Sequence, residues 1–275
     1  MFRLVITILI LLVYGVNLIN ASNFNQDNIK VDFEDISLGI YKVDALKINW
    51  NNPTFLQGFD TNRAEIIEFP LNNKCLKVIY PKQKFGSKNS GIQFKVNLEK
   101  SVEEVYYSYK VFFVRDFDFN KGGKLPGVAG GDIKYALSGN KSDGIKAWSV
   151  RAMWRKQGQL VQYIYHPNQL KNYGDDFIWK LQGKEVFIQP EKWHLIETKI
   201  KLNTPTLNDG IIQVWFDKKM VLNLKNFKFR KVSKLKIDQF IFCTFFGGNN
   251  KSWAPKNECY AYFDNIVIIK KNIMD

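Results

Sequence analysis

The chain has 275 residues, with 40 Lys and Arg against 26 Asp and Glu. Its two histidines and three cysteines are too few for a histidine-based metal site, a serine–histidine hydrolase or a disulfide framework. The formal net charge of +14 favours a polyanionic partner, because a basic surface concentrates anionic ligands. Nucleic acid, an acidic glycan and an anionic membrane all meet that condition, and so does a solvated Lys-rich surface without a partner.

The first 21 residues have the three parts of a secretory signal peptide. Arg3 precedes an apolar stretch from Leu4 to Val16, and polar and small residues follow as far as Ala21. A membrane-spanning helix needs ~20 apolar residues, so a single anchor is the less favoured alternative. We expect cleavage after Ala21 and a secreted, extracellular protein that is free of the membrane. Cleavage removes Arg3 alone among charged residues, which leaves 39 basic against 26 acidic residues, a net charge of +13.

Residues 22–275 are expected to form one domain, because no Pro/Ser-rich linker or internal repeat divides them. Short segments of β-branched and aromatic residues, bounded by Gly, Asn, Asp and Pro, predict strands. Nine are predicted, at residues 76–80, 91–96, 105–114, 147–154, 160–165, 193–202, 211–216, 237–246 and 260–269. No segment has a sustained helical period. The pattern predicts an all-β fold, a two-sheet sandwich or jelly roll.

The predicted strands 147–154 and 160–165 carry the most information. Side chains alternate between the two faces of a strand. One face of the first strand is apolar, with Trp148, Val150, Ala152 and Trp154, and the other carries Ser149, Arg151, Met153 and Arg155. Tyr163 and Tyr165 share a face of the second. The turn 156–159 predicts a tight hairpin that brings the two polar faces side by side.

Residues 121–131 form a glycine-rich segment that contains Lys124. It resembles a phosphate-binding loop, but it lacks the Gly-x-x-x-x-Gly-Lys-Ser/Thr order and no helical pattern follows. We interpret it as a loop whose glycines allow a sharp turn and a close approach to a ligand.

Several short motifs follow one another along the chain. They are GGKLPG at 122–127, SVRAMW at 149–154, YIY at 163–165, LNTP at 202–205 with Asp209-Gly210, and FFGG at 245–248 with WAP at 253–255. Together this ordered set resembles polysaccharide lyase family 14, which contains alginate lyases and lyases of glucuronate polymers. It is also similar to the family 20 glucuronan lyases. The resemblance extends over residues 75–269.

The resemblance implies a β-jelly roll whose concave sheet forms a substrate cleft, with Lys124, Ser149, Arg151, Tyr163 and Tyr165 at the functional positions. The implied reaction is β-elimination, in which a base removes the C5 proton of a 4-linked uronate. Arg151 suits a planar contact with the uronate carboxylate, and Lys124 adds a second positive charge. The two cations are expected to lower the tyrosine pKa. Tyr165 is the leading base or acid, with Tyr163 as its partner, although the order can be reversed.

Other residues are candidates for contacts with the sugar. Ser149 is expected to bind a sugar hydroxyl or to position Arg151. Asn249 and Trp253 lie in a Gly-rich segment that is expected to cover the cleft, with Trp253 stacking on a sugar ring or, equally, packing in the core. Arg63 is a weaker substrate-binding candidate. His166 is expected to face away from Tyr165, because the two are adjacent in a strand.

No cofactor and no catalytic metal are expected. Glu34 and Asp264 are candidates for a structural calcium ion, and Cys243 and Cys259 are the more plausible disulfide pair, with Cys75 left over. We expect a monomer that binds an acidic polysaccharide and not nucleic acid. The alternative to a lyase is a non-catalytic, lectin-like module that binds an acidic polysaccharide. A hydrolase with two acidic catalytic residues ranks below both.

Overall fold

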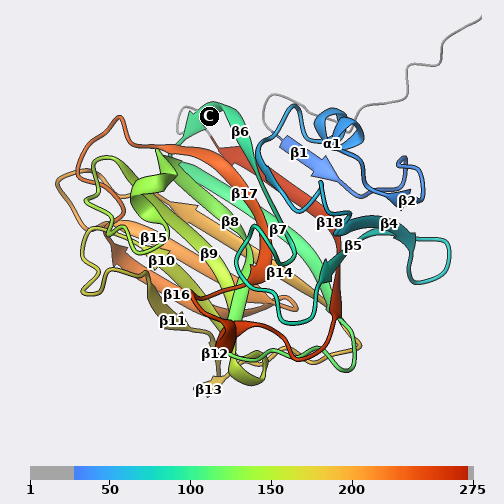
Figure 1. Ribbon diagram of the computed structural model, residues 1–275. Coiled ribbons are helices and arrows are strands. Elements are labelled where there is room, and N and C mark those ends of the chain that lie inside the picture. Colours follow the sequence, from blue (N-terminus) through green and yellow to red (C-terminus); the bar gives the residue numbers. More distant parts are fainter. Residues whose placement is uncertain (1–27, 272–275) are drawn as a thin grey trace, which may run out of the picture.

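Two antiparallel β-sheets make up most of the computed structural model, which describes residues 28–271 (Figure 1). The seven-stranded sheet has the order β11 (Asp175–Ile178), β10 (Leu160–Tyr165), β9 (Ala147–Arg155), β8 (Gly122–Gly131), β17 (Ile237–Phe246), β6 (Ile92–Val102) and β3 (Thr54–Gln57). The nine-stranded sheet has the order β16 (Lys219–Phe227), β15 (Gly210–Phe216), β14 (Trp193–Lys201), β7 (Glu104–Phe113), β18 (Cys259–Lys271), β5 (Lys74–Tyr80), β4 (Ala64–Glu68) and β2 (Gly39–Ile40). Strand β1 (Asn28–Val31) also pairs with β18.

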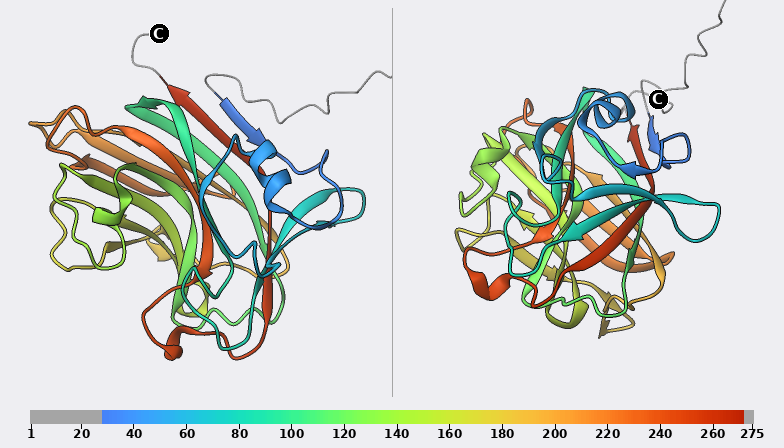
Figure 2. Two further views of the ribbon diagram at one scale, coloured as in Figure 1. Left: turned by 45° about the horizontal axis from the view of Figure 1, so that its top comes forward. Right: turned by 45° about the vertical axis from the view of Figure 1, so that its right-hand side comes forward.

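The remaining elements are short. They are helix α1 (Val43–Asn49), the 3₁₀ helices η1 (Ile133–Ala136), η2 (Lys156–Gly158) and η3 (Lys251–Trp253), and a separate hairpin of β12 (Lys180–Leu181) and β13 (Lys184–Glu185). Strands bend as they cross the molecule, and α1 lies beside the N-terminal strands (Figure 2). The predicted all-β jelly roll is confirmed.

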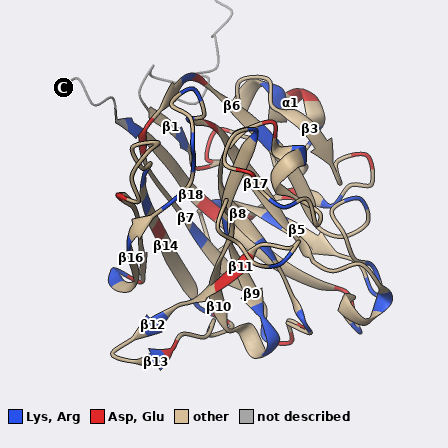
Figure 3. Cartoon of the chain, turned by 90° about the vertical axis from the view of Figure 1, so that its left-hand side faces the viewer, with Lys and Arg blue, Asp and Glu red and all other residues tan. Residues whose placement is uncertain are grey.

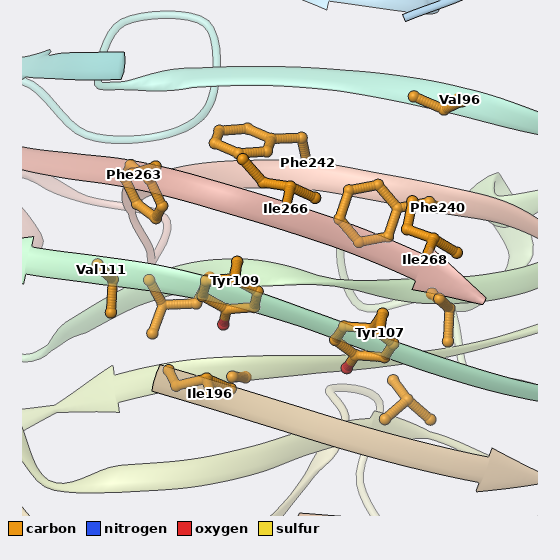
Figure 4. Close-up of a cluster of buried hydrophobic side chains, with 14 of the residues drawn as sticks. Val96, Tyr107, Tyr109, Val111, Ile196, Phe240, Phe242, Phe263, Ile266 and Ile268 are labelled. Atoms are coloured by element: carbon orange, nitrogen blue, oxygen red, sulfur yellow. The ribbon is translucent and has the colours of Figure 1, made fainter. Parts of the chain in front are cut away.

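The main core lies between the two sheets, where alternate side chains of both meet. Tyr107 and Tyr109 of β7 pack there near Phe240 and Phe242 of β17, and all four are fully buried (Figure 4). Burial of each large apolar side chain contributes roughly 1.5–3 kcal/mol. The opposite face of the seven-stranded sheet, here called its outer face, is therefore the one available for a site.

All nine predicted strands are present, and β10 and β17 have the predicted bounds. Helix α1 was not predicted, since seven residues are too few to show a helical period. The prediction that residues 121–131 form a loop was wrong: Gly122–Gly131 is a central strand, paired with β9 and β17.

The glycine-rich segment forms strand β8 because of the neighbouring side chains of β9. A Cβ atom at Gly123 would lie 2.0 Å from the Trp154 ring, and one at Gly130 would lie 2.6 Å from Trp148 Nε1. The glycines therefore leave room for tryptophans of the adjacent strand instead of making a turn. Pro126 is tolerated in this strand because the ladders on both sides are interrupted there.

Cys243 and Cys259, the more plausible pair from sequence, are not bonded to each other. Cys75, Cys243 and Cys259 are free, buried thiols. Cys243 lies in β17 of the seven-stranded sheet, whereas Cys259 begins β18 of the nine-stranded sheet. Within residues 28–271, no helix is long and apolar enough to cross a membrane. The predicted signal peptide and its cleavage at Ala21 lie outside the described residues.

Candidate active site

The hairpin of β9 and β10 builds one side of the site. The two strands pair in a register that sets Tyr163 opposite Arg151 and Tyr165 opposite Ser149. The turn closes through a hydrogen bond from Arg155 N to Gln159 O of 2.7 Å. Residues directly opposite in an antiparallel pair point to the same face. The predicted side-by-side arrangement of the two polar faces is confirmed.

Alternation along β9 separates the core from the site as predicted. Trp148 and Trp154 are buried in the main core, whereas Met153 belongs to a separate small cluster with Tyr163 and Tyr165. This small cluster lies on the outer face of the seven-stranded sheet.

Lys124 reaches the same place from β8. It pairs with Met153 across the β8–β9 ladder. Its Nζ atom donates a hydrogen bond to Met153 Sδ at 2.7 Å and lies 3.3 Å from the centroid of the Tyr163 ring. The ammonium or amine group of Lys124 is thus held between a thioether and an aromatic face.

Arg151 is 3% exposed, and Gly127 of β8 makes room for it. A Cβ atom at Gly127 would lie 2.7 Å from Arg151 Cα and 3.0 Å from its Cγ. Arg151 Nε is buried and has no hydrogen-bond partner among the described residues. An unsatisfied buried donor costs about 1–3 kcal/mol, which a bound acceptor would recover.

Three basic side chains surround the Tyr163 ring. The Nζ atom of Lys124 lies 3.3 Å from its centroid, and the Cζ atoms of Arg155 and Arg151 lie at 5.5 and 5.8 Å. Asp176 of β11 accepts two hydrogen bonds from Arg155, at 2.6 and 2.9 Å. The cluster therefore has an excess of positive charge, which favours an anionic ligand.

Burial lowers the pKa of Lys124 well below its ordinary value, and the positive charges of Arg151 and Arg155 lower it further. Desolvation disfavours the charged form of a lysine, and so do neighbouring cations. The neutral amine is the form that can accept a proton. Lys124 is therefore suited to act as a base, a role that the sequence suggested for a tyrosine.

Tyr163 has the opposite shift. Burial raises its pKa and Tyr165 raises it further, while Arg151 and Arg155 lower it by less. The expectation that the nearby cations lower the tyrosine pKa is therefore wrong for Tyr163, because desolvation of the phenolate outweighs them. Tyr163 stays a phenol and can donate a proton.

Backbone groups of two loops hold the tyrosine hydroxyls in place. Gly174 N donates to Tyr163 Oη at 3.1 Å, and Gly139 N donates to Tyr165 Oη at 3.3 Å. Tyr163 in turn donates to Tyr165 at 3.4 Å. Both phenols thus have fixed positions before any ligand binds.

Ser149 is fully buried, and its hydroxyl donates to Ala136 O of η1 at 2.9 Å. It therefore fixes η1 on the sheet. Neither of its predicted roles, a bond to a sugar hydroxyl or the positioning of Arg151, is visible in its contacts.

The structure separates Arg63 from the site. Arg63 is 5% exposed, and its guanidinium donates to the carbonyls of Gly91 at 2.7 Å and Lys88 at 2.9 Å. It also donates to Thr61 Oγ1 at 2.6 Å. The prediction of a substrate contact is corrected to a structural role, because the guanidinium already holds the loop before β6.

Trp253 and Asn249 lie near the site in the segment after β17. A Cβ atom at Gly247 would lie 3.8 Å from both Met153 Cε and Trp253 Cε3, so the thioether and the indole approach the same glycine. Trp253 is partly exposed and Asn249 is exposed. Their predicted contacts with a sugar stay predictions.

Both histidines are buried and bonded elsewhere. His166 Nε2 lies 3.0 Å from Asp175 Oδ2 and packs against Phe227, which confirms that it faces away from Tyr165. Burial lowers its pKa despite Asp175. His194 Nδ1 lies 2.9 Å from Asp217 Oδ2.

No group of three or more His, Cys, Asp or Glu side chains within residues 28–271 is arranged to hold a metal ion. Glu34 accepts a hydrogen bond from Lys74 N at 3.2 Å, and Asp264 accepts one from Asn73 Nδ2 at 3.4 Å. The calcium site at Glu34 and Asp264 stays a prediction.

Several parts of this site were not predicted from the sequence. Met153 and Arg155 were placed on the same face as Arg151, and that alternation was a signal sufficient to include them. The backbone donors Gly139 and Gly174 had no sequence signal, because their approach depends on how two loops fold over β10.

A two-sheet jelly roll with this cluster on an outer face has the fold of known polysaccharide lyases. Alginate lyase Aly36B superposes with a TM-score of 0.78 at 22% identity, covering 90% of this chain and 99% of that one. The alginate lyase of Aplysia kurodai gives 0.71 at 24% identity, covering 88% and 98%. The endo-β-1,4-glucuronan lyase of the fungus Trichoderma reesei gives 0.55 at 13% identity, covering 86% and 95%.

The chain belongs to polysaccharide lyase family 14, whose model matches residues 70–266. It is therefore a polysaccharide lyase, and the resemblance read from its motifs is confirmed. No curated protein shows significant sequence similarity to it.

Proposed function

We propose that this chain is a secreted lyase that cleaves a uronic-acid polymer, alginate rich in mannuronate or a glucuronan-like chain, by β-elimination. The observation that carries the proposal is the cluster of Lys124, Arg151 and Arg155 around Tyr163, with Asp176 as its one bonded carboxylate. A site with this charge favours a substrate that brings its own carboxylate.

Arg151 is proposed to bind the carboxylate of the uronate whose C5 proton is removed. Its unpartnered Nε is a donor that a carboxylate oxygen would satisfy. When the C5–H bond breaks, negative charge moves onto that carboxylate. A fixed cation therefore stabilises the transition state more strongly than the ground state. A guanidinium can bind both oxygens of a carboxylate in one plane, which a lysine ammonium cannot do.

Lys124 is proposed to accept the C5 proton as a neutral amine. The C5–H electrons form the C4=C5 double bond, the C4–O bond breaks, and the departing oxygen takes a proton. Tyr163 is suited to supply that proton because its raised pKa keeps it protonated. The resulting ammonium of Lys124 then returns its proton through solvent or to the phenolate.

Solved complexes of Aly36B support the choice of substrate. One contains a variant with a lysine and a tyrosine replaced by alanine, bound to an alginate tetrasaccharide. Another has a lysine and a methionine replaced and contains an alginate trisaccharide. This chain brings the same three residue types into contact, as Lys124, Tyr163 and Met153.

The test is the ultraviolet absorbance of unsaturated uronate ends, measured on polymannuronate, polyguluronate, glucuronan and a glycosaminoglycan. We expect product from at least one of them, and a loss of at least about 10²-fold in kcat for Lys124→Met. Lys47→Met, on exposed α1, is the control and should keep full activity. Tyr165→Phe separates the two candidate bases. If Tyr165→Phe loses about 10²-fold in kcat while Lys124→Met stays active, Tyr165 and not Lys124 is the base.

Binding of these polymers without any product would instead identify a non-catalytic module. Export is tested separately, by expression of the full chain and N-terminal sequencing of the protein in the medium. We expect the mature protein to begin at Ser22.

A further inference from the structure

A long basic run leads from β16 into β17. Eight basic residues and no acidic one lie between positions 218 and 236, namely Lys218, Lys219, Lys225, Lys228, Arg230, Lys231, Lys234 and Lys236. Within residues 28–271, Arg230 and Lys236 are the members of this run that form ion pairs, both with Glu103. The remaining six form no ion pair with the described residues.

The fold carries part of this run to the loop that reaches the active site. Lys231 N donates to Gly144 O at 2.7 Å. Further along, a Cβ atom at Gly131 would lie 2.7 Å from Leu235 Cδ1. The segment 228–236 therefore lies along the end of β8 and beside the loop that precedes β9. Gly139 of the same loop donates to Tyr165 Oη.

Four lysines lie on these adjacent segments: Lys146, Lys228, Lys231 and Lys234, called here the lysine patch. Lys146, Lys231 and Lys234 are exposed and Lys228 is partly exposed. Tyr135, which is 38% exposed, lies beside the patch with Lys146 Nζ 4.7 Å from its ring centroid. Its ring offers a face on which a pyranose can pack.

Two acidic groups lie near the patch, and one of them, Asp143, interacts electrostatically with the patch lysine Lys146. Asp143 accepts hydrogen bonds from the backbone of Ile145 and Lys146, both at 2.8 Å. Asp132 pairs with Lys134 at 2.7 Å. None of the four patch lysines forms an ion pair in the described part of the chain. Basic segments outnumber acidic ones on the side of the molecule shown in Figure 3.

We propose that the lysine patch is a second binding surface, which holds uronate units of the polymer beyond those at the active site. The inference rests on the proposed function. A polymer with one carboxylate per sugar has units to spare for the patch while others occupy the active site, whereas a short oligosaccharide held at the active site has few such units. Exposed charges act over about 8 Å at physiological salt, so this contact is sensitive to ionic strength.

The test replaces all four patch lysines by Gln and compares polymannuronate with a mannuronate tetrasaccharide. Exposed charge contacts are each worth a factor of about two, so we expect kcat/KM for the polymer to fall about tenfold at low salt. For the tetrasaccharide the change should stay below about twofold, and about 0.5 M salt should remove most of the difference. The matched control replaces four exposed lysines by Gln: Lys42, just before α1, Lys47 on α1, and Lys180 and Lys184 on the β12–β13 hairpin.

An equal loss of kcat/KM on the polymer and the tetrasaccharide would overturn the proposed binding surface, and so would an equal loss in the control variant. A double variant, Lys231→Gln with Lys234→Gln, gives a smaller loss of the same kind if the quadruple variant does not fold. Binding of fluorescent polymannuronate to a Lys124→Met background separates this inference from the proposed function. If the wild-type chain yields no unsaturated product from any polymer, the proposed function fails. In the binding experiment, weaker binding by the patch variant still supports the lysine patch, and unchanged binding overturns it.

Discussion

Replacement of Arg155 by Gln tests whether Lys124 acts as the base. The Lys124 Nζ and Arg155 Cζ atoms lie 3.3 and 5.5 Å from the centroid of the Tyr163 ring, so they are at most about 8.8 Å apart. At that distance, two unit charges repel by about 2 kcal/mol at an effective dielectric of 20 and about 0.5 kcal/mol in water. Arg155→Gln removes this repulsion, so the pKa of Lys124 should rise.

The sign of the change in the pH–rate profile follows from the role of the amine. A base works when it is deprotonated, so kcat/KM falls as the pH drops through the pKa of Lys124. The acid limb of the profile should therefore move to higher pH in Arg155→Gln. Asp176, released from its ion pair, would favour the ammonium form and move the limb in the same direction.

The assay is the initial rate of unsaturated uronate formation against pH at constant ionic strength. Arg115→Gln is the control, because Arg115 also pairs with a carboxylate, that of Glu191 at 2.8 Å, but is 76% exposed. Its profile should match the wild type. An acid limb that stays in place or moves to lower pH in Arg155→Gln would refute the assignment of Lys124 as the base.

Three further substitutions probe the structure around this centre. Arg151→Lys should lower kcat/KM about 10²-fold, because one ammonium cannot reproduce the planar contact with the carboxylate, and an unchanged rate would contradict that role. Ser149→Ala should lower the free energy of unfolding in urea by about 1 kcal/mol through the lost bond to η1, with KM changed less than about twofold; a large rise in KM would restore the predicted sugar contact. Gly123→Ala should lower the free energy of unfolding by about 2–3 kcal/mol, because the added Cβ would meet the Trp154 ring. Gly247→Ala, whose added Cβ would lie 3.6 Å from its nearest atom, should lower it by less than about 0.5 kcal/mol.

Much of the fold follows from sequence because most strands have a local signal. Strands β10 and β17 are dense in β-branched and aromatic residues, and their predicted bounds are those of the structure. Strand β8 has no such signal. Gly and Pro are depleted in strands, so Gly122–Gly131 reads as a loop until Trp148 and Trp154 of β9 are seen to occupy the space above the glycines.

The site residues also divide into those with a local sequence signal and those without one. Alternation and hairpin length place Arg151 beside Tyr163 from sequence alone. The role of Arg63 depends on contacts with residues about 25 positions away, which no local pattern contains. The donors to the tyrosine hydroxyls depend on loop conformations, for which the sequence offers no period.

The choice of base shows why residue types alone are insufficient. From sequence, a phenol beside two cations has a lowered pKa, and this reasoning favours a tyrosine. In the folded chain, burial disfavours the phenolate of Tyr163 and the ammonium of Lys124 alike. Among the three basic side chains, lysine loses its proton first, because its ordinary pKa lies below that of arginine. The arginines therefore keep the charge that binds a carboxylate, and the lysine becomes the group that can accept a proton.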